Sequence, residues 1–146
     1  MNPLSSAART AASPQETPFY IPATASAARP RRTLKADDTF VVVDSHGDIG
    51  ASLGDPDGIF NNDTRYLSRL ELRINELEPL LLGSNVRDDN TVLAVDLTNP
   101  DIYVQDRLVL PKDTVHIVRT SFVWGDSFYT RIHIRNHGAQ PVSLNL

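Results

Sequence analysis

Apolar and polar residues alternate along much of this chain. A period of two predicts strands, because successive side chains of a strand point to opposite faces. One such run covers residues 67–74, where Leu70, Leu72 and Ile74 point one way and charged residues point the other. Three further runs alternate in the same way: residues 91–97, 114–123 and 127–136. No stretch keeps the 3.6-residue period of a helix, so the pattern predicts an all-β fold.

Shorter apolar runs extend this pattern. Residues 39–44 are β-branched and apolar on both faces, which is typical of a strand covered on both sides. Two short strands are expected at residues 102–104 and 108–110. Strands at regular spacing with hairpin turns between them favour an antiparallel β-sandwich, which we expect to be supersandwich-like.

One hairpin is expected around the central run. Residues 75–78 should reverse the chain and pair residues 67–74 with residues 79–82. Residues 83–90 are then expected to form a polar loop.

The alternation in residues 127–136 predicts which side chains face the core and which face outward. Four residues of the 127–136 run are expected to face the core: Phe128, Thr130, Ile132 and Ile134. The residues between them are expected to face outward: Tyr129, Arg131, His133 and Arg135.

Alternation resumes after Pro141 and continues to Leu146 without a closing turn, so we expect a domain that is incomplete at its C-terminus. The alternative is a natural edge strand.

The N-terminal part differs in composition from the rest. Residues 1–36 are rich in Ala, Ser, Thr and Pro and predict a disordered tail, whereas residues 37–146 are expected to form the β-sandwich domain. The tail contains Arg and few acids, as mitochondrial transit peptides do, but it lacks their sustained amphipathic helix. A flexible tail is therefore the preferred interpretation.

Charge and composition exclude several classes of partner. Of the 14 basic and 18 acidic residues, five basic and one acidic lie in residues 1–36, so the domain holds nine basic and 17 acidic residues. This acidic balance predicts no nucleic-acid partner. No apolar run approaches the length that crosses a bilayer, so no membrane partner is expected. Cys is absent, which excludes disulfides and fits a cytoplasmic location, and self-association is left open.

A polar cluster precedes the central run and is the first candidate site. It contains Asp63, Thr64 and Arg65, followed by Tyr66. In the structural interpretation, Asp63 and Thr64 cap a turn and Arg65 forms an ion pair or covers the sheet end. In the functional interpretation, the guanidinium and the carboxylate hydrogen-bond a ligand or support an interface.

Other acids give only weak candidates for chemistry. Asp44, His46 and Asp48 are spaced like ligands of a calcium loop, but Ile49 stands where such a loop needs Gly. Hydrogen-bonded turn residues are the preferred account, and we expect no metal and no cofactor. The adjacent acids at residues 37–38 and 88–89 lie in polar segments and are expected to be solvated loop charges rather than a catalytic pair. No catalytic residue is therefore assigned.

Trp124 is the remaining candidate. It is expected at a hairpin tip beside Gly125. An exposed indole there could stack on the apolar face of a sugar ring, whereas a core or domain-contact Trp is the more common case.

Several motifs in strand and turn contexts suggest a family. They are TFVV at residues 39–42, DSHGDI at 44–49, DGIF at 57–60 and DTRYLS at 63–68. Further matching stretches are residues 70–75, 79–82 and 131–136, with Gly138 before Pro141. From about residue 33 to residue 146 the chain resembles the N-terminal domain of bacterial-type glycogen debranching enzymes, the amylo-α-1,6-glucosidase family. The family usually has Asn-Gly in its first hairpin turn, so Asn75–Glu76 predicts a different or looser turn.

The resemblance implies a role beside an enzyme. In the family the domain is longer and precedes an (α/α)6 helical barrel that carries the catalytic carboxylates. The chain is thus expected to be a non-catalytic domain that packs against such a barrel and helps shape its active-site rim, with α-glucan as partner. The candidate rim or interface residues are Asp63, Thr64, Arg65 and Tyr66. Two other hypotheses stay open: a stand-alone carbohydrate-binding module, and a non-sugar interaction or oligomerisation domain.

Overall fold

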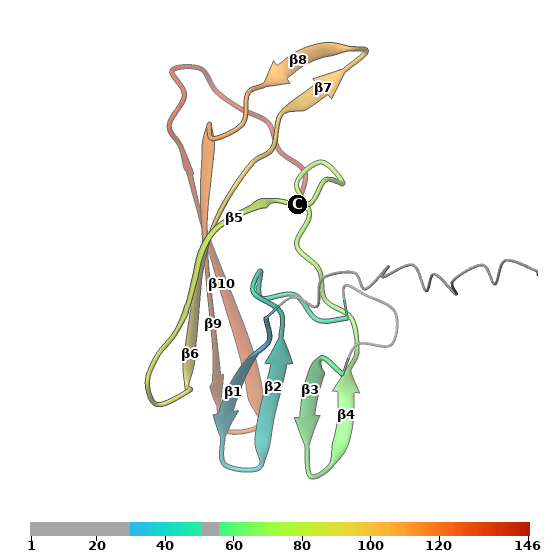
Figure 1. Ribbon diagram of the computed structural model, residues 1–146, viewed down its shortest axis with the longest axis vertical. Helices are drawn as coiled ribbons and strands as arrows, with labels where there is room; N and C mark the ends of the chain where they lie inside the picture. The colour runs from blue at the N-terminus through green and yellow to red at the C-terminus, as the bar shows by residue number, and fades with distance from the viewer. Residues whose placement is uncertain (1–29, 51–55) are drawn as a thin grey trace, which may run out of the picture.

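The computed structural model describes residues 30–50 and 56–146 (Figure 1). Every regular element in this part of the chain is a strand, as predicted, and none of its segments forms a helix able to span a membrane. The strands are β1 (Arg32–Ala36), β2 (Thr39–Val43), β3 (Gly58–Asn61), β4 (Thr64–Leu67), β5 (Leu80–Val86), β6 (Val92–Thr98), β7 (Ile102–Val104), β8 (Arg107–Leu110), β9 (Val115–Trp124) and β10 (Ser127–Asn136). Strand β1 thus begins before the domain boundary expected at residue 37, while most of the expected tail, residues 1–29, lies outside the described residues.

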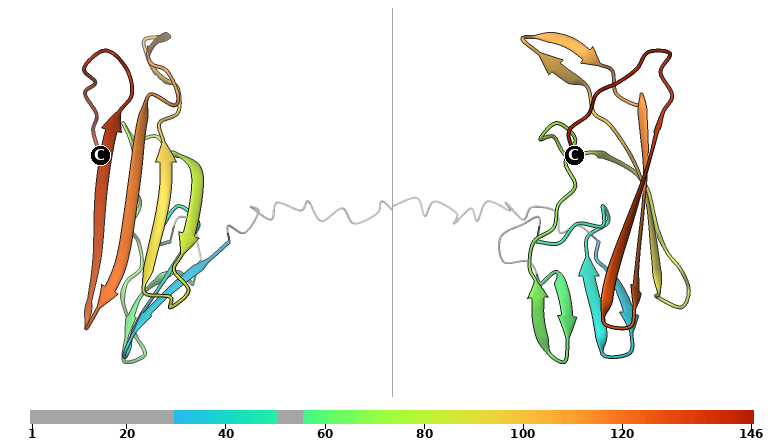
Figure 2. Two further views of the ribbon diagram at one scale, coloured as in Figure 1. Left: turned by 90° about the vertical axis from the view of Figure 1, so that its left-hand side faces the viewer. Right: turned by 180° about the vertical axis from the view of Figure 1, so that it is seen from behind.

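The strands form two antiparallel sheets of four and one of two. The first sheet has the order β1-β2-β3-β4, and the second, longer sheet has the order β10-β9-β6-β5. Figures 1 and 2 show the two sheets facing each other, with β1 and β2 lying over the two central strands of the longer sheet, β9 and β6, toward the β9–β10 turn. The predicted antiparallel sandwich is therefore present in the described residues.

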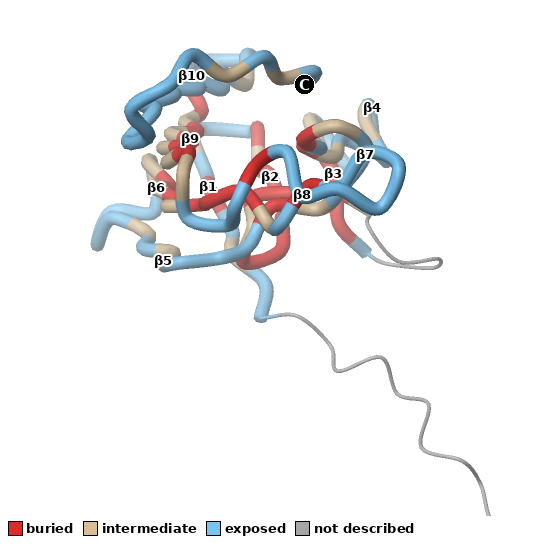
Figure 3. The backbone as a smooth tube through the Cα atoms, turned by 90° about the horizontal axis from the view of Figure 1, so that it is seen from above, coloured by how far each residue is buried: buried red, intermediate tan, exposed pale blue. Residues whose placement is uncertain are grey.

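Burial follows the predicted alternation in the two central strands of the longer sheet. In β9 the inward positions are buried, from Val115 through Ile117 to Val123, while the positions between them are partly exposed. In β6, Leu93, Val95 and Leu97 are buried in the same way. Figure 3 shows buried residues gathered between the sheets and exposed residues along β10. The apolar core therefore lies between β1–β2 and β6–β9.

Strand β2 is covered on both faces, as its composition predicts. Thr39, Val41 and Val43 are buried, and Phe40 and Val42 between them are half-buried. The Phe40 ring stacks on Phe60 of β3 with centroids 4.7 Å apart. Both faces of this strand thus find apolar neighbours.

The expected central strand at residues 67–74 is wrong as an element, although its alternation is right. Strand β4 ends at Leu67, and the following residues make only isolated bridges, Ile49 with Leu70 and Ile74 with Leu77. Leu72 and Ile74 are buried as predicted. The ladder stops because β3 begins at Gly58 and offers no partner beyond Leu67, so the segment crosses the gap between the sheets in extended form.

The expected hairpin with residues 79–82 is also wrong. Strand β5 pairs with β6 over its whole length and includes residues 83–86, which the sequence assigned to a loop. The Asn75–Glu76 turn does form, but tightly. Both residues have positive φ, 47° and 67°, as a primed two-residue turn requires, so the expected looser turn is not found.

Strand β10 is an exposed edge whose inward face is only partly covered. Phe128 packs against the core, but Ile132 and Ile134 remain 40% exposed because β1 and β2 lie over β9 and β6. Thr130, also expected to face the core, is exposed and lies 3.1 Å from Ser121 through its hydroxyl. Residues 141–146 form no strand, contrary to expectation; the Asn145 N–H instead donates to the Asn75 side chain.

The tight turn leads to a stability prediction. Glu76 is an L-residue held at positive φ, where Gly has no steric penalty. We expect Glu76→Gly to raise the free energy of unfolding by roughly 0.5–1 kcal/mol in urea denaturation. Glu78 lies two residues further on and does not have positive φ, so Glu78→Gly should lower the free energy of unfolding. Equal effects of the two substitutions would contradict the role of the turn.

Candidate functional site

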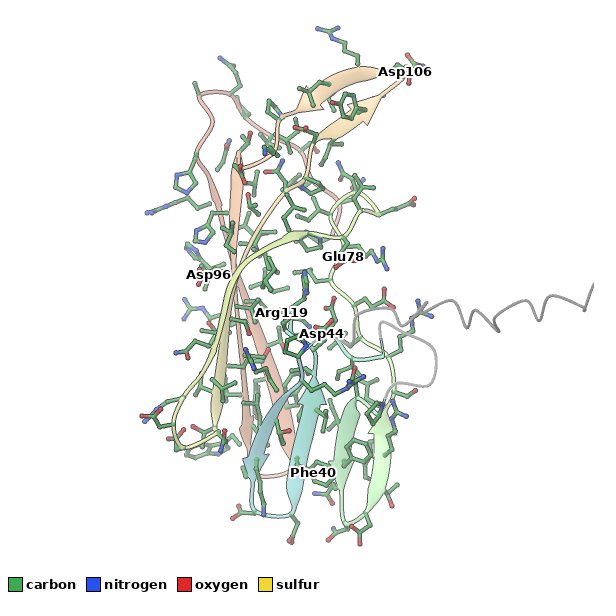
Figure 4. All side chains as sticks on the ribbon, viewed as in Figure 1. Phe40, Asp44, Glu78, Asp96, Asp106 and Arg119 are labelled. Atoms are coloured by element: carbon green, nitrogen blue, oxygen red, sulfur yellow. The ribbon has the colours of Figure 1, made fainter. Side chains whose placement is uncertain are left out.

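A buried polar junction ties the two sheets together. Arg119 of β9 and Asp48 are both almost fully buried, and the guanidinium lies 2.5 Å from the carboxylate. The Leu72 N–H donates to the same carboxylate at 3.0 Å, and Arg119 also donates to the His46 carbonyl at 3.2 Å. Figure 4 shows Arg119 and Asp44 together in the middle of the molecule. Three chain segments thus meet at one ion pair.

Asp44 organises the turn that presents Asp48. Its carboxylate accepts the N–H groups of His46 and Asp48, at 2.8 and 2.9 Å. These bonds confirm the interpretation of Asp44 and Asp48 as hydrogen-bonded turn residues. Among residues 30–50 and 56–146, no group of three or more His, Asp or Glu side chains is arranged to hold a metal ion.

Burial and the nearby guanidinium shift the pKa of Asp48 in opposite directions. Desolvation raises the pKa of its carboxyl above the ordinary value of 3.8, and the Arg119 guanidinium partly offsets that rise. Sequence reasoning missed Arg119, although a signal was present. Arg119 occupies an inward position in the alternation of β9, and a cation placed in a core needs an acid opposite.

The Asp63–Tyr66 cluster forms one short hairpin. Asn62 and Asp63 make the β3–β4 turn, both at positive φ, and Tyr66 on β4 is 69% exposed. Asp63 and Thr64 are exposed as well. The hairpin therefore brings the four predicted residues together at one end of the shorter sheet.

Arg65 lies against its own sheet. Its guanidinium is 5.9 Å from the Phe60 ring centroid and donates to the Asp57 carbonyl. Gly58 leaves room for this path, because a Cβ there would come within 2.7 Å of Arg65 Nε. Asp57 in turn is buried and pairs with Arg31 at 2.7 Å. These contacts are those of the structural interpretation, in which Arg65 covers the sheet end.

The paired acids are solvated, as predicted. Asp37 and Asp38 are exposed in the β1–β2 turn, and Asp88 and Asp89 are exposed in the β5–β6 turn. Asp89 accepts a hydrogen bond from the Thr91 hydroxyl at 2.6 Å, which lowers the pKa of its carboxyl. The bond holds the turn in shape.

Trp124 lies at the end of β9 and is 76% exposed, so it is not a core residue. It borders a groove of about 620 Å³ that three turns build together. The groove is lined by Ala36 and Asp37 from the first turn, by Arg87, Thr91 and Val92 from the second, and by residues 122–125 from the third. Sequence reasoning proposed the tryptophan but not the groove, which depends on turns far apart in the chain.

The buried ion pair gives a prediction with a pH dependence. Arg119→Met leaves the Asp48 carboxylate buried without its cation, so we expect a loss of about 3–5 kcal/mol in the free energy of unfolding at pH 7. The exposed Arg131→Met on β10 serves as the matched control and should cost little.

The loss should shrink in acid. Without the guanidinium, the pKa of the folded Asp48 carboxyl rises further above 3.8, so the folded variant binds its proton more tightly than the unfolded chain does. The difference in free energy of unfolding between the variant and the unsubstituted protein should therefore become smaller as the pH falls from 7 through that raised pKa. Urea denaturation at pH 7, 6 and 5 measures this, and a constant difference across the series would contradict it.

Comparison with known proteins places the chain in a family. No curated protein and no solved structure matches it. A family model described as the N-terminal domain of (some) glycogen debranching enzymes matches residues 34–146. The match spans every strand from β2 to β10 and most of β1. The chain therefore belongs to the family of glycogen debranching enzyme N-terminal domains.

Proposed function

We propose that this chain is a non-catalytic domain of a glucan-debranching glucosidase that docks on a helical catalytic domain and helps shape the rim of its active site. Membership of the N-terminal domain family supports the link to debranching. The observation that carries the docking role is an exposed apolar hairpin, the β7–β8 arm, formed by residues 102–110. Figure 1 shows this arm projecting beyond both large sheets.

Ile102 and Leu110 are buried at the base of the β7–β8 arm, and the residues beyond them expose apolar surface. Tyr103 is 58% exposed, and Val104, Leu108 and Val109 are similarly open to solvent. A two-stranded hairpin alone is marginally stable in water, and clustered exposed apolar side chains mark interaction surfaces. A partner surface that covers the arm would remove this apolar area from water.

The base of the β7–β8 arm is held firmly. Asn99 is fully buried and donates through its side-chain amide to the carbonyls of Pro100 and Pro111, at 2.8 and 2.7 Å. Its side-chain oxygen accepts the Val115 N–H at 2.7 Å. One residue thus links both ends of the arm to the start of β9, so the arm is presented in a defined direction.

The buried carboxylates support a non-catalytic role. Asp48 binds Arg119, Asp44 holds its own turn, and Asp57 pairs with Arg31. Glycoside hydrolysis needs two carboxyl groups facing each other across an open cleft, roughly 5–10 Å apart. Each of these three acids is instead engaged in a structural contact.

The Asp63–Tyr66 hairpin suits the rim part of the proposal. Strand β4 is an edge of its sheet, and in Figure 1 it stands on the same side of the longer sheet as the β7–β8 arm. The β3–β4 turn lies at the opposite end of the molecule from the arm in Figure 1, so only a domain that spans the length of this side would contact both the arm and the hairpin. Arg65, supported from behind by Phe60, would hold this hairpin in place.

The non-catalytic part predicts an enzymatic result. The chain alone, incubated with a branched α-glucan limit dextrin, should release no glucose above a buffer blank. Glucose release that disappears when one acid of this chain is replaced by its amide would contradict the proposal.

The docking part predicts a binding result. The chain should form a complex with a separately produced helical catalytic domain of a glycogen debranching enzyme, as measured by sedimentation velocity. Because exposed aromatic residues dominate interface energies, Tyr103→Ala should weaken the complex by about tenfold or more.

The matched control makes the same change on another face. Tyr129 of β10 is 46% exposed, comparable to Tyr103, but lies on the outer face of the longer sheet. Tyr129→Ala should leave the complex unchanged. Equal weakening by both substitutions, or no complex with the unsubstituted chain, would overturn the docking role.

A further inference from the structure

Three aromatic side chains line up on the outward face of the longer sheet. Phe122 and Trp124 occupy alternate positions of β9, and the register places Tyr129 of β10 directly opposite Phe122. The Phe122 and Tyr129 rings are stacked, with centroids 5.0 Å apart and planes inclined by 14°. We call Phe122, Trp124 and Tyr129 the aromatic strip. The strip offers aromatic surfaces at the end of the sheet where β9 turns into β10.

The aromatic strip runs into the groove beside Trp124. The groove volume of about 620 Å³ lies within the range of about 300–1,000 Å³ typical of small-molecule sites. Its walls are joined by backbone hydrogen bonds: the Lys35 N–H donates to the Asn90 carbonyl at 3.0 Å, and the Arg87 N–H donates to the Val92 carbonyl at 2.9 Å. The groove is thus a feature that the folded turns hold in place.

Polar groups stand at the rim of this apolar groove. Asp37 brings a carboxylate, Arg87 a guanidinium and Thr91 a hydroxyl, from two different turns. A flat aromatic surface flanked by hydrogen-bonding groups of both charges suits a pyranose ring, whose C–H face stacks on the aromatic ring while its hydroxyls bind carboxylate and guanidinium groups.

The surrounding charge argues for a neutral ligand. Exposed acids crowd the turns at this end of the molecule: Asp37, Asp38, Asp88, Asp89 and Asp126. Arg87 lies at the groove among them and already pairs with Asp89 at 3.4 Å. Phosphorylated or polyanionic ligands would be repelled here, whereas an uncharged polyhydroxyl chain would not.

We propose that a linear α-glucan binds along the aromatic strip and into this groove, with Trp124 as the main stacking platform. The choice of α-glucan rests on the proposed function; the site itself rests on the geometry. Figures 1 and 2 show the turns that build the groove at the opposite end of the longer sheet from the β7–β8 arm. Glucan binding and docking on the arm therefore use separate surfaces and can be tested independently.

Trp124 is the only tryptophan of the chain, so intrinsic fluorescence excited at the indole band reports on this site alone. Titration of the full chain with maltoheptaose should give a saturable change in Trp124 emission. Isothermal titration calorimetry then compares the variants, since Trp124→Ala removes the fluorophore. Trp124→Ala should weaken binding at least about tenfold, and Trp124→Tyr, which keeps a stacking ring, should weaken it less.

Two further substitutions locate the ligand. Tyr129→Ala should weaken maltoheptaose binding severalfold, because it removes one ring of the stacked pair, while Tyr103→Ala on the β7–β8 arm should have no effect. These substitutions have the opposite effects in the docking experiment. All of them replace exposed side chains, and unchanged thermal denaturation would show that the variants fold.

The outcomes are distinct. No saturable binding of maltoheptaose at millimolar concentration, or binding that Trp124→Ala leaves intact, would overturn the site. Neither result would bear on docking. Loss of docking with glucan binding retained would instead overturn the proposed function and leave the site standing.

Discussion

The ion pair between Arg119 and Asp48 is the contact on which the two sheets depend. Arg119 belongs to the longer sheet, and Asp48 belongs to the turn after β2 of the shorter sheet. The same carboxylate accepts the N–H of Leu72, in the segment that crosses between the sheets. Because a buried charge without its partner is costly, this pair permits only a narrow range of relative positions of the sheets. The apolar core supplies most of the burial, and the ion pair specifies the alignment.

The crossing segment shows why this constraint is needed. Residues 68–73 leave β4 and make no continuous ladder, so their backbone groups must find other partners. The Leu70 N–H and carbonyl are bonded to Ile49, and the Leu72 N–H to Asp48. Both partners lie in the turn that Asp44 organises. A single polar turn therefore stabilises a stretch that would otherwise lose its hydrogen bonds between the two sheets.

The sequence predicted elements well where burial alone determines them. Strands β6 and β9 bury one face fully, and their alternation predicted both their existence and their inward residues. Prediction failed at residues 67–74 because alternation reports which side chains are buried but not which strand, if any, pairs with them. For the same reason β5 was assigned to the wrong partner: its apolar start suggested a local hairpin, whereas its ladder forms with β6.

The candidate sites also differ in whether their residues are neighbours in the sequence. Asp63, Thr64, Arg65 and Tyr66 are neighbours in the chain, so a single hairpin brings them together and sequence reasoning could group them. The groove beside Trp124 is built by three turns, with Asp37 and Trp124 separated by most of the domain. No local sequence pattern predicts that these three turns come together in the fold. Arg119 was accessible in principle, since a cation in the inward phase of β9 requires a buried acid.

Strand β9 connects the two exposed surfaces, so their relative positions are defined by the fold. The β7–β8 arm is fixed through Asn99 at one end of the longer sheet, and the aromatic strip lies at the other end. Strand β9 runs continuously between them and is held on the shorter sheet by Arg119. A glucan bound at the strip would therefore stay at a set distance from a domain docked on the arm. Holding one branch of a polymer near a catalytic site raises the effective concentration of its other branches there, even when the holding contact is weak. The affinity of the strip itself need not be high for such an arrangement to matter.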